Sequence, residues 1–211
     1  MCISGPLSIS TFVVSIISSI ILIFYGKKKY YKENLIMGLF FIYIAGVQLF
    51  EYVMWIDKGE YNNIATKILP FYIYIEPLIL YHLKLWILNK TETIWEYLLE
   101  VIYILNFIYN ISSYYIENPN DITKSTVYGL NWKWILYLNW NLYYILSIIT
   151  IFIYFPFEIS IPFFIFSFLF LIISYLKRYN TSKISVGSLW CLLSASIPIF
   201  MIFFEYLFID K

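Results

Sequence analysis

The sequence predicts an all-α fold, a polytopic bundle of transmembrane helices that forms one domain over residues 1–211. Two observations lead to this prediction. Of the residues, 62% are hydrophobic and only 13% are charged, about half the charged share of an ordinary soluble domain. The apolar residues also fall in long runs that match the thickness of a bilayer. So few charges cannot cover a soluble protein of this size, and the bilayer is the expected solvent for most of the chain.

A helix needs about 20 mainly apolar residues to cross the hydrocarbon core of a bilayer. We count the following segments as seven spans: 6–25, 35–56, 68–88, 94–109, 134–155, 159–176 and 186–209. The division between the fifth and sixth is the weakest, because residues 134–176 contain a single charge, Glu158. Pro156 marks the best break in this stretch, since the residue before a proline disfavours helix. Six or eight spans are the alternatives to seven.

The charges beside the first span predict the orientation of the bundle. Lys27, Lys28, Lys29 and Lys32 follow this span, and such positive clusters are retained in the cytoplasm. The N-terminus would then lie outside the cell or in a lumen. Over the whole chain the basic residues divide evenly between the two sides, so the predicted orientation depends on the first loop.

The second span, 35–56, contains one charge, Glu51. A carboxylate near the centre of a membrane helix costs about 2.5–3.5 kcal/mol, and less towards the ends of the helix. Gln48 and Trp55 lie three residues before and four residues after Glu51, so the three side chains share one helix face. Gly46 is small enough to let a neighbouring helix approach closely. We therefore treat Gln48, Glu51 and Trp55 as candidates for binding a ligand or a proton.

The third span carries a second candidate, Glu76, directly before Pro77. Pro77 cannot donate a hydrogen bond to the carbonyl of Ile73, which predicts a helix kink beside the carboxylate. If the second and third spans pack as an antiparallel pair, Glu76 and Glu51 should lie at similar depth in the outer half. Two carboxylates this close in an apolar medium would not both ionise, so one would hold a proton near neutral pH. Alternatively, each carboxylate bonds to a polar neighbour and only fixes helix packing.

The inner part of the third span contains His82 and Lys84. His82 is the single histidine of the chain, and without a second histidine or a nearby cysteine we predict no metal site. His82 is expected to be either a hydrogen-bonded structural residue or a proton relay. Lys84 can extend to the inner interface, where Glu96 and Glu100 of the fourth span would neutralise it.

Polar residues occur in two further spans. Glu205 shares one face of the last span with Pro198, which predicts a bend in that helix. Because Glu205 is close to the end of the span, it either contributes to an intramembrane site or reaches the lipid headgroups. Asn139 places a further polar side chain in the outer half of the fifth span.

The segment 46–55 reads G-V-Q-L-F-E-Y-V-M-W and contains a Q-x-x-E-Y-x-x-W pattern. The pattern resembles a signature of uncharacterised multi-spanning membrane proteins of giant DNA viruses and some protists. Heavy use of Ile, Tyr, Phe, Asn and Lys, which have AT-rich codons, agrees with such a source. The resemblance covers about ten of the 211 residues. It implies a viral membrane or an internal membrane of the host, and it implies no catalytic roles.

These features leave three functions open. The first is a small transporter, channel or proton-coupled protein, whose polar cluster would contain Gln48, Glu51, Glu76 and either Glu205 or Asn139. The second is a structural or interaction protein of a viral or host membrane, in which the polar residues join helices. The third is an intramembrane lipid-modifying enzyme that uses His82 with Glu51 or Glu76.

The enzyme hypothesis is the weakest of the three. The chain contains no Walker motif, no H-E-x-x-H and no G-x-S-x-G, and we predict no cofactor. The net charge of +1 argues against a nucleic-acid partner. The expected partners are the lipid bilayer and an ion, a proton or a small-molecule ligand.

Overall fold

The computed structural model describes residues 4–89, 91, 93–117, 122–126, 129–131, 155–156, 159–165, 168–169, 172 and 195–208. Most of these residues are helical, in agreement with the predicted all-α class, although two short strands occur among them. Among these described residues, three helices are long and apolar enough to cross a membrane, or four if one bent pair of helices forms a single span. Apart from Phe155, the predicted span 134–155 lies outside the described residues, as does much of 159–176, so seven spans stay a prediction.

Helices α1 (Gly5–Tyr25) and α2 (Tyr31–Ile56) match the first two predicted spans, 6–25 and 35–56. The helix α2 begins four residues earlier than predicted, because the 3-10 turn η1 (Lys28–Tyr30) leads directly into it. The two long helices therefore form a hairpin with the predicted lysine cluster at its turn.

The interface between α1 and α2 is built from small and polar side chains. The buried face of α1 consists mainly of Gly5, Ser8, Thr11, Ser15, Ser18 and Ser19. Its exposed large apolar residues include Ile9, Val13, Val14, Ile17, Ile20, Ile21 and Phe24. Gly38 of α2 allows the close approach, because a Cβ atom there would overlap the side chain of Ile23. An apolar exterior around a small-residue interior is the arrangement that a lipid solvent favours.

The predicted span 68–88 is two helices, which corrects the sequence-based boundaries. Helix α3 (Glu60–Tyr74) begins eight residues earlier than predicted, and α4 (Glu76–Leu88) follows after a break at Ile75. The axes of the two helices are bent by 46°. Pro77 lies in the first turn of α4. Because it has no N–H, it cannot continue the backbone hydrogen bonds of α3. Asn89 ends α4 in the left-handed conformation, with φ of 51°.

The fourth predicted span, 94–109, corresponds to α5 (Ile94–Glu117), which continues eight residues further than expected. The next described segment is an antiparallel hairpin of strands β1 (Lys124–Thr126) and β2 (Gly129–Asn131). Lys124 pairs with Asn131, and Thr126 pairs with Gly129. The hairpin lies between the predicted spans 94–109 and 134–155.

The last described helix, α10 (Ile197–Phe208), falls within the predicted span 186–209 and packs along α1. The segment just before α10 lies close to α1, because the hydroxyl of Ser18 donates a hydrogen bond of 2.8 Å to the carbonyl of Ala195. Residues 186–194 lie outside the described part of the chain.

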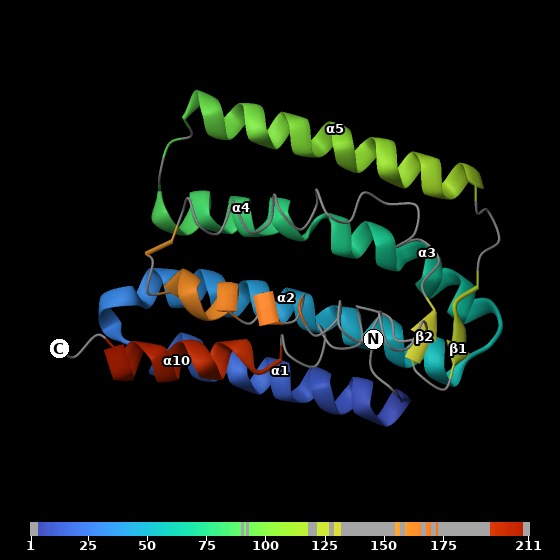
Figure 1. Cartoon of the computed structure of the whole chain (residues 1–211), viewed down its shortest axis with the longest axis horizontal. Helices are drawn as coiled ribbons and strands as arrows, with labels where there is room; N and C mark the ends of the chain where they lie inside the picture. The colour runs from blue at the N-terminus through green and yellow to red at the C-terminus, as the bar shows by residue number, and fades with distance from the viewer. Residues whose placement is uncertain are drawn as a thin grey trace.

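Helix α2 lies between two pairs of helices (Figure 1). Helices α1 and α10 pack on one side of it, and α3 and α4 pack on the other, with α5 beyond them. One end of the bundle contains the α1–α2 turn with Lys27, Lys28 and Lys29, and we call it the lysine end. The opposite end contains the two strands, and we call it the hairpin end. Buried apolar clusters fill the space near each end, with Phe41 and Ile197 in one and Met54 and Leu69 in the other.

Candidate functional site

Two tyrosines join α2 to α3 just before the helix break. The Tyr43 hydroxyl donates to the Tyr72 carbonyl at 2.8 Å, and the Tyr72 hydroxyl donates to the Tyr43 carbonyl at 2.6 Å. Their rings are stacked, with centroids 4.2 Å apart and an interplanar angle of 8°. Gly46 makes room for this pair, because a Cβ atom at that position would overlap the Tyr72 hydroxyl. The expected close approach at Gly46 is therefore made by an aromatic side chain.

The break itself is capped from α5. The Tyr103 hydroxyl donates a hydrogen bond to the carbonyl of Tyr74, the last residue of α3. The N–H of Ile75 still binds the carbonyl of Phe71, at 3.2 Å. Buried carbonyls that lose their helical partner must find another donor, and side-chain hydroxyls of α2 and α5 supply it at Tyr72 and Tyr74.

Glu76 is buried at the first position of α4, immediately after the break. Its carboxylate lies close enough to Tyr43, Tyr72 and Tyr103 to interact electrostatically with all three phenol groups. The N-terminal end of a helix carries partial positive charge, which favours a negative group at this position. A carboxylate and three phenol hydroxyls from α2, α3 and α5 therefore gather near the middle of the bundle. We call these four residues the break cluster.

Glu51 does not belong to the break cluster, contrary to the depth predicted from the sequence. The Tyr43–Tyr72 pair and a hydrogen bond of 3.0 Å from Asn62 to the Met54 carbonyl fix the antiparallel register of α2 and α3. In this register Glu51 is roughly 16 Å nearer the hairpin end than Glu76, at about 1.5 Å per residue. The prediction failed because α3 begins at Glu60 and not at residue 68, which places Glu76 further from the hairpin end.

The side chains predicted to share a face with Glu51 are largely buried with it. Glu51 has an exposed fraction of 0%, and Gln48 is also buried. Trp55 is partly buried and lies against the start of α1, where a Cβ atom added to Gly5 would be 3.3 Å from its Cβ. Glu51 and Gln48 thus lie inside the bundle near the hairpin end, whereas Trp55 marks the closure of α1 onto α2.

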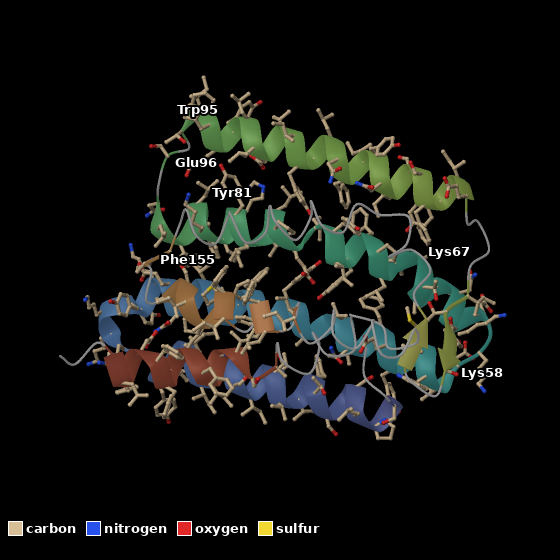
Figure 2. The ribbon with its side chains drawn as sticks, viewed as in Figure 1. Lys58, Lys67, Tyr81, Trp95, Glu96 and Phe155 are labelled. Atoms are coloured by element: carbon tan, nitrogen blue, oxygen red, sulfur yellow. The ribbon has the colours of Figure 1, made fainter. Side chains whose placement is uncertain are left out.

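One of the two predicted partners of Lys84, Glu96, neutralises it. The buried Lys84 ammonium is 2.8 Å from Oε1 of Glu96, so this pair ties α4 to the start of α5. Glu96 also accepts the N–H of Thr93 at 2.6 Å, and Thr93 Oγ1 accepts the N–H of Glu96 at 3.3 Å, which is a capping box. Figure 2 shows Glu96 and the nearby Tyr81 between α4 and α5.

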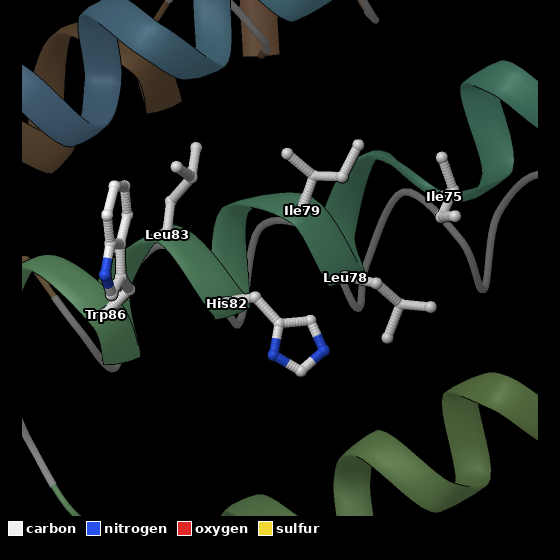
Figure 3. A pocket seen from close by; sticks show the side chains of 6 residues that line it. All are labelled: Ile75, Leu78, Ile79, His82, Leu83 and Trp86. Carbon is white, nitrogen blue, oxygen red and sulfur yellow. The ribbon is translucent and has the colours of Figure 1, made fainter.

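Glu100, the other proposed partner of Lys84, is paired with His82 instead. Nε2 of His82 is 3.1 Å from Oε1 of Glu100, and the histidine side chain has an exposed fraction of 61%. His82 also lines an apolar pocket of about 470 Å³ along α4. The pocket residues are Ile75, Leu78, Ile79, His82, Leu83 and Trp86 (Figure 3). In this view His82 and Leu78 point towards α5, whereas Leu83 and Ile79 point the other way.

The last-span candidates take positions that the sequence did not predict. Glu205 turns inward and is buried against the α1–α2 turn, which favours the first of its two predicted roles, inside the bundle, over contact with the headgroups. Pro198 lies in the first turn of α10, where a missing N–H costs little, so it produces no kink inside this helix. Asn139 falls outside the described residues. Among those that are described, no three His, Cys, Asp or Glu side chains gather as a metal site would require.

The sequence analysis missed the tyrosines of the break cluster. An aromatic belt at the membrane interfaces accounts for tyrosines near span ends, yet Tyr43 lies at the middle of α2 and far from either end of it. That central position was a usable signal, since a belt tyrosine lies near the end of a span. The pairing of Tyr43 with Tyr72 could not be predicted without the register of α2 and α3.

The fold and site so far define a mainly helical protein with helices able to cross a membrane and with charged groups buried between them. Comparison with family models, with curated proteins and with solved structures finds no match for this chain. The resemblance to giant-virus and protist membrane proteins therefore stays a prediction.

Proposed function

We propose that this protein is a small membrane transporter that moves protons, or a solute coupled to protons, through the break cluster. The observation that carries the proposal is the broken helix α3–α4 with a buried carboxylate, Glu76, at the start of its second half. Secondary transporters bind substrates and coupling ions near the bilayer midplane, at the exposed ends of such half-helices. A carboxylate there can take up and release a proton, because charging it in an apolar surrounding is costly.

The hydroxyls around Glu76 are suited to pass a proton to it. A phenol group both donates and accepts hydrogen bonds. Tyr43, Tyr72 and Tyr103 each donate to a backbone carbonyl, so their oxygen atoms keep lone pairs that can accept a proton. A change in the bend at Ile75 would alter the carbonyls that hold these hydroxyls. Proton binding and the geometry of the break are coupled in this proposal.

Ionisable side chains occur at three successive depths along the bundle. Glu51 lies near the hairpin end, Glu76 lies near the middle, and the His82–Glu100 pair lies towards the lysine end. Glu76 and His82 are six residues apart on α4, which is roughly 9 Å along the helix axis. Steps of about 9 and 16 Å are too long for direct proton transfer, so water or hydroxyl groups must bridge them. The series suggests a route between the two ends.

The test is proton flux into vesicles that contain the purified protein and a pH-sensitive dye. We expect Glu76→Gln to lower the flux by about 100-fold or more, the usual scale for removing a proton-transferring side chain. Glu60→Gln makes the same chemical change at an exposed carboxylate and should leave the flux unchanged. Circular dichroism and gel filtration would confirm that both variants fold. Full flux in Glu76→Gln, or no flux above that of empty vesicles in the wild type, would refute the proposal.

The variant Glu51→Gln distinguishes a proton route along the whole bundle from a single proton-binding site at the break cluster. Loss of flux in both Glu51→Gln and Glu76→Gln supports a relay along the bundle. Loss only in Glu76→Gln restricts the chemistry to the break cluster and leaves Glu51 as a residue that joins helices.

A structural or interaction protein is the second candidate, and the density of polar contacts between helices favours it. The tyrosine hydroxyls at the break and the side chain of Asn62 bind backbone groups of neighbouring segments. In that case Glu76→Gln should change thermal stability in detergent, and the wild-type vesicles should show no flux.

A further inference from the structure

A second buried carboxyl group lies at the lysine end, outside the break cluster. Glu205 of α10 is buried against the turn between α1 and α2. Its Oε2 atom accepts the backbone N–H of Lys27 at 2.7 Å and the side-chain amide of Asn34 at 3.2 Å. The same oxygen therefore accepts both of these hydrogen bonds.

The other oxygen of each of these side chains has no donor. Oε1 of Glu205 and Oδ1 of Asn34 are fully buried, and neither has a hydrogen-bond partner among the described residues. An ionised carboxylate and an amide oxygen can only accept hydrogen bonds. A buried acceptor without a donor costs about 1–3 kcal/mol, and more if it is charged. One donor placed between the two oxygens would remove both costs.

We propose that Glu205 is a proton-binding site, and that the folded protein holds the proton on Oε1. The protonated oxygen becomes a donor towards Oδ1 of Asn34, while Nδ2 of Asn34 already donates to Oε2. The two planar groups then form a cyclic acid–amide pair with two parallel hydrogen bonds. Binding the proton also removes a negative charge from the buried interface between α10 and the α1–α2 turn.

Charged groups on the packed elements act in opposite directions on this site. The Lys27 ammonium lies 5.3 Å from the ring centroid of Tyr206 and attracts a carboxylate at Glu205. Glu33, at the start of α2, repels one. The Tyr206 hydroxyl on α10 donates to the carbonyl of Tyr25 at 3.2 Å, so it is engaged with α1. Because these charges oppose each other, the missing hydrogen-bond donor at Oε1 decides whether the carboxyl group is protonated.

Gly26 holds Asn34 in the position that the site needs. A Cβ atom at Gly26 would overlap the amide group of Asn34, so a larger residue would push this side chain away from Glu205. The turn glycine, the asparagine of α2 and the glutamate of α10 therefore form one unit. Its protonation stabilises the docking of α10 on the lysine end.

Infrared difference spectroscopy on the full-length protein in lipid vesicles tests the site. We expect the wild type to show the C=O stretch of a protonated carboxylic acid at neutral pH, and Glu205→Gln to lack that band. Asn34→Ala should shift the band, because the acid loses its hydrogen-bond acceptor. A protonated-acid signal that is equally strong in Glu205→Gln, or the absence of any such signal in the wild type, would overturn the proposal.

Thermal unfolding in detergent supplies an independent measurement. A folded state that holds a proton which the unfolded chain releases loses stability as the pH rises. We expect the wild-type melting temperature to fall between pH about 5 and about 8 by more than that of Glu205→Gln, in which an amide N–H replaces the acid donor. Glu60→Gln, with an exposed carboxylate replaced, should follow the wild type. Equal pH dependence in the wild type and Glu205→Gln would contradict a bound proton.

Discussion

Tyr43 and Tyr72 bind each other reciprocally, because each hydroxyl donates to the backbone carbonyl of the other residue, at 2.8 and 2.6 Å. The pair joins the middle of α2 to the last turn of α3, directly before the break. Each hydrogen bond thus connects a side chain to the other helix, and the stacked rings fill the space between the two backbones. The position of the break relative to α2 depends on this pair.

Gly46→Ala should destabilise the protein, because the added methyl group would overlap the Tyr72 hydroxyl. We expect a loss of about 1–3 kcal/mol in the free energy of unfolding, which is typical of overpacking. Tyr72→Phe removes the overlapping oxygen, so the double variant should lose less than the sum of the two single variants. Strictly additive losses, measured by unfolding in detergent, would show that Tyr72 does not press on Gly46.

Tyr103→Phe tests the cap on the broken helix. The variant keeps the aromatic ring but leaves the buried carbonyl of Tyr74 without the hydroxyl donor from α5. We expect a loss of about 1–3 kcal/mol in the free energy of unfolding. Tyr109→Phe is the matched control on the same helix, since Tyr109 has an exposed fraction of 71% and should be nearly neutral. If the two variants behave alike, the Tyr103 hydroxyl does not stabilise the break.

The two ion pairs between α4 and α5 should differ in strength. The Lys84 side chain has an exposed fraction of 3%, so Glu96→Gln leaves a buried ammonium without its counter-charge. A loss of about 3 kcal/mol is expected for breaking such a pair. Glu100→Gln should cost about 0–1 kcal/mol, because its partner His82 is largely exposed.

A double variant distinguishes the stability that the ion pair contributes from the contribution of each side chain alone. Lys84→Met with Glu96→Gln removes both charges and should be more stable than Glu96→Gln alone. Chemical denaturation in mixed micelles would give these differences. A double variant less stable than either single variant would mean that Lys84 contributes through its packing against Tyr81.

Asn62 should be the residue whose loss most weakens the hairpin end. Its amide donates to the carbonyls of Met54 and Thr123, at 3.0 and 3.1 Å, and its Oδ1 accepts the N–H of Thr123 at 3.1 Å. Asn62→Ala leaves several of these buried groups without a partner, and we expect a loss of about 2–3 kcal/mol. Hydrogen exchange should then speed up at Thr123 but not at Tyr72. Unchanged exchange at Thr123 would contradict this role.

Spin labels on α1 test whether its apolar face meets lipid. A label at Val14, which is exposed, should be accessible to oxygen dissolved in the membrane and protected from a water-soluble nickel complex. A label at Ser15, the next residue on the buried face, should be protected from both reagents. Nickel access at Val14 would place this face of α1 in water.

The sequence predicted α1 and α2 within a few residues, because each is one long apolar run with a polar connection on both sides. It did not predict that the third span divides at Ile75, although Pro77 indicated a disturbance there. A proline removes one hydrogen bond wherever it occurs, but whether the helix kinks or breaks depends on what else binds the freed carbonyls. Here the hydroxyls of Tyr43 and Tyr103 bind the carbonyls of Tyr72 and Tyr74 at the break, and the positions of these hydroxyls depend on helix packing.

The sequence by itself determined the solvent and the residue types: long apolar helices, lysines after the first span and a few carboxylates that must be compensated. Only the tertiary structure decided which carboxylate meets which partner. It joined Glu96 to Lys84, Glu100 to His82 and Glu205 to Asn34. The cost of burying a charged side chain follows from its own sequence surroundings. The partner that compensates the charge depends on how distant segments pack, as Lys27 and Glu205 show, which are 178 residues apart.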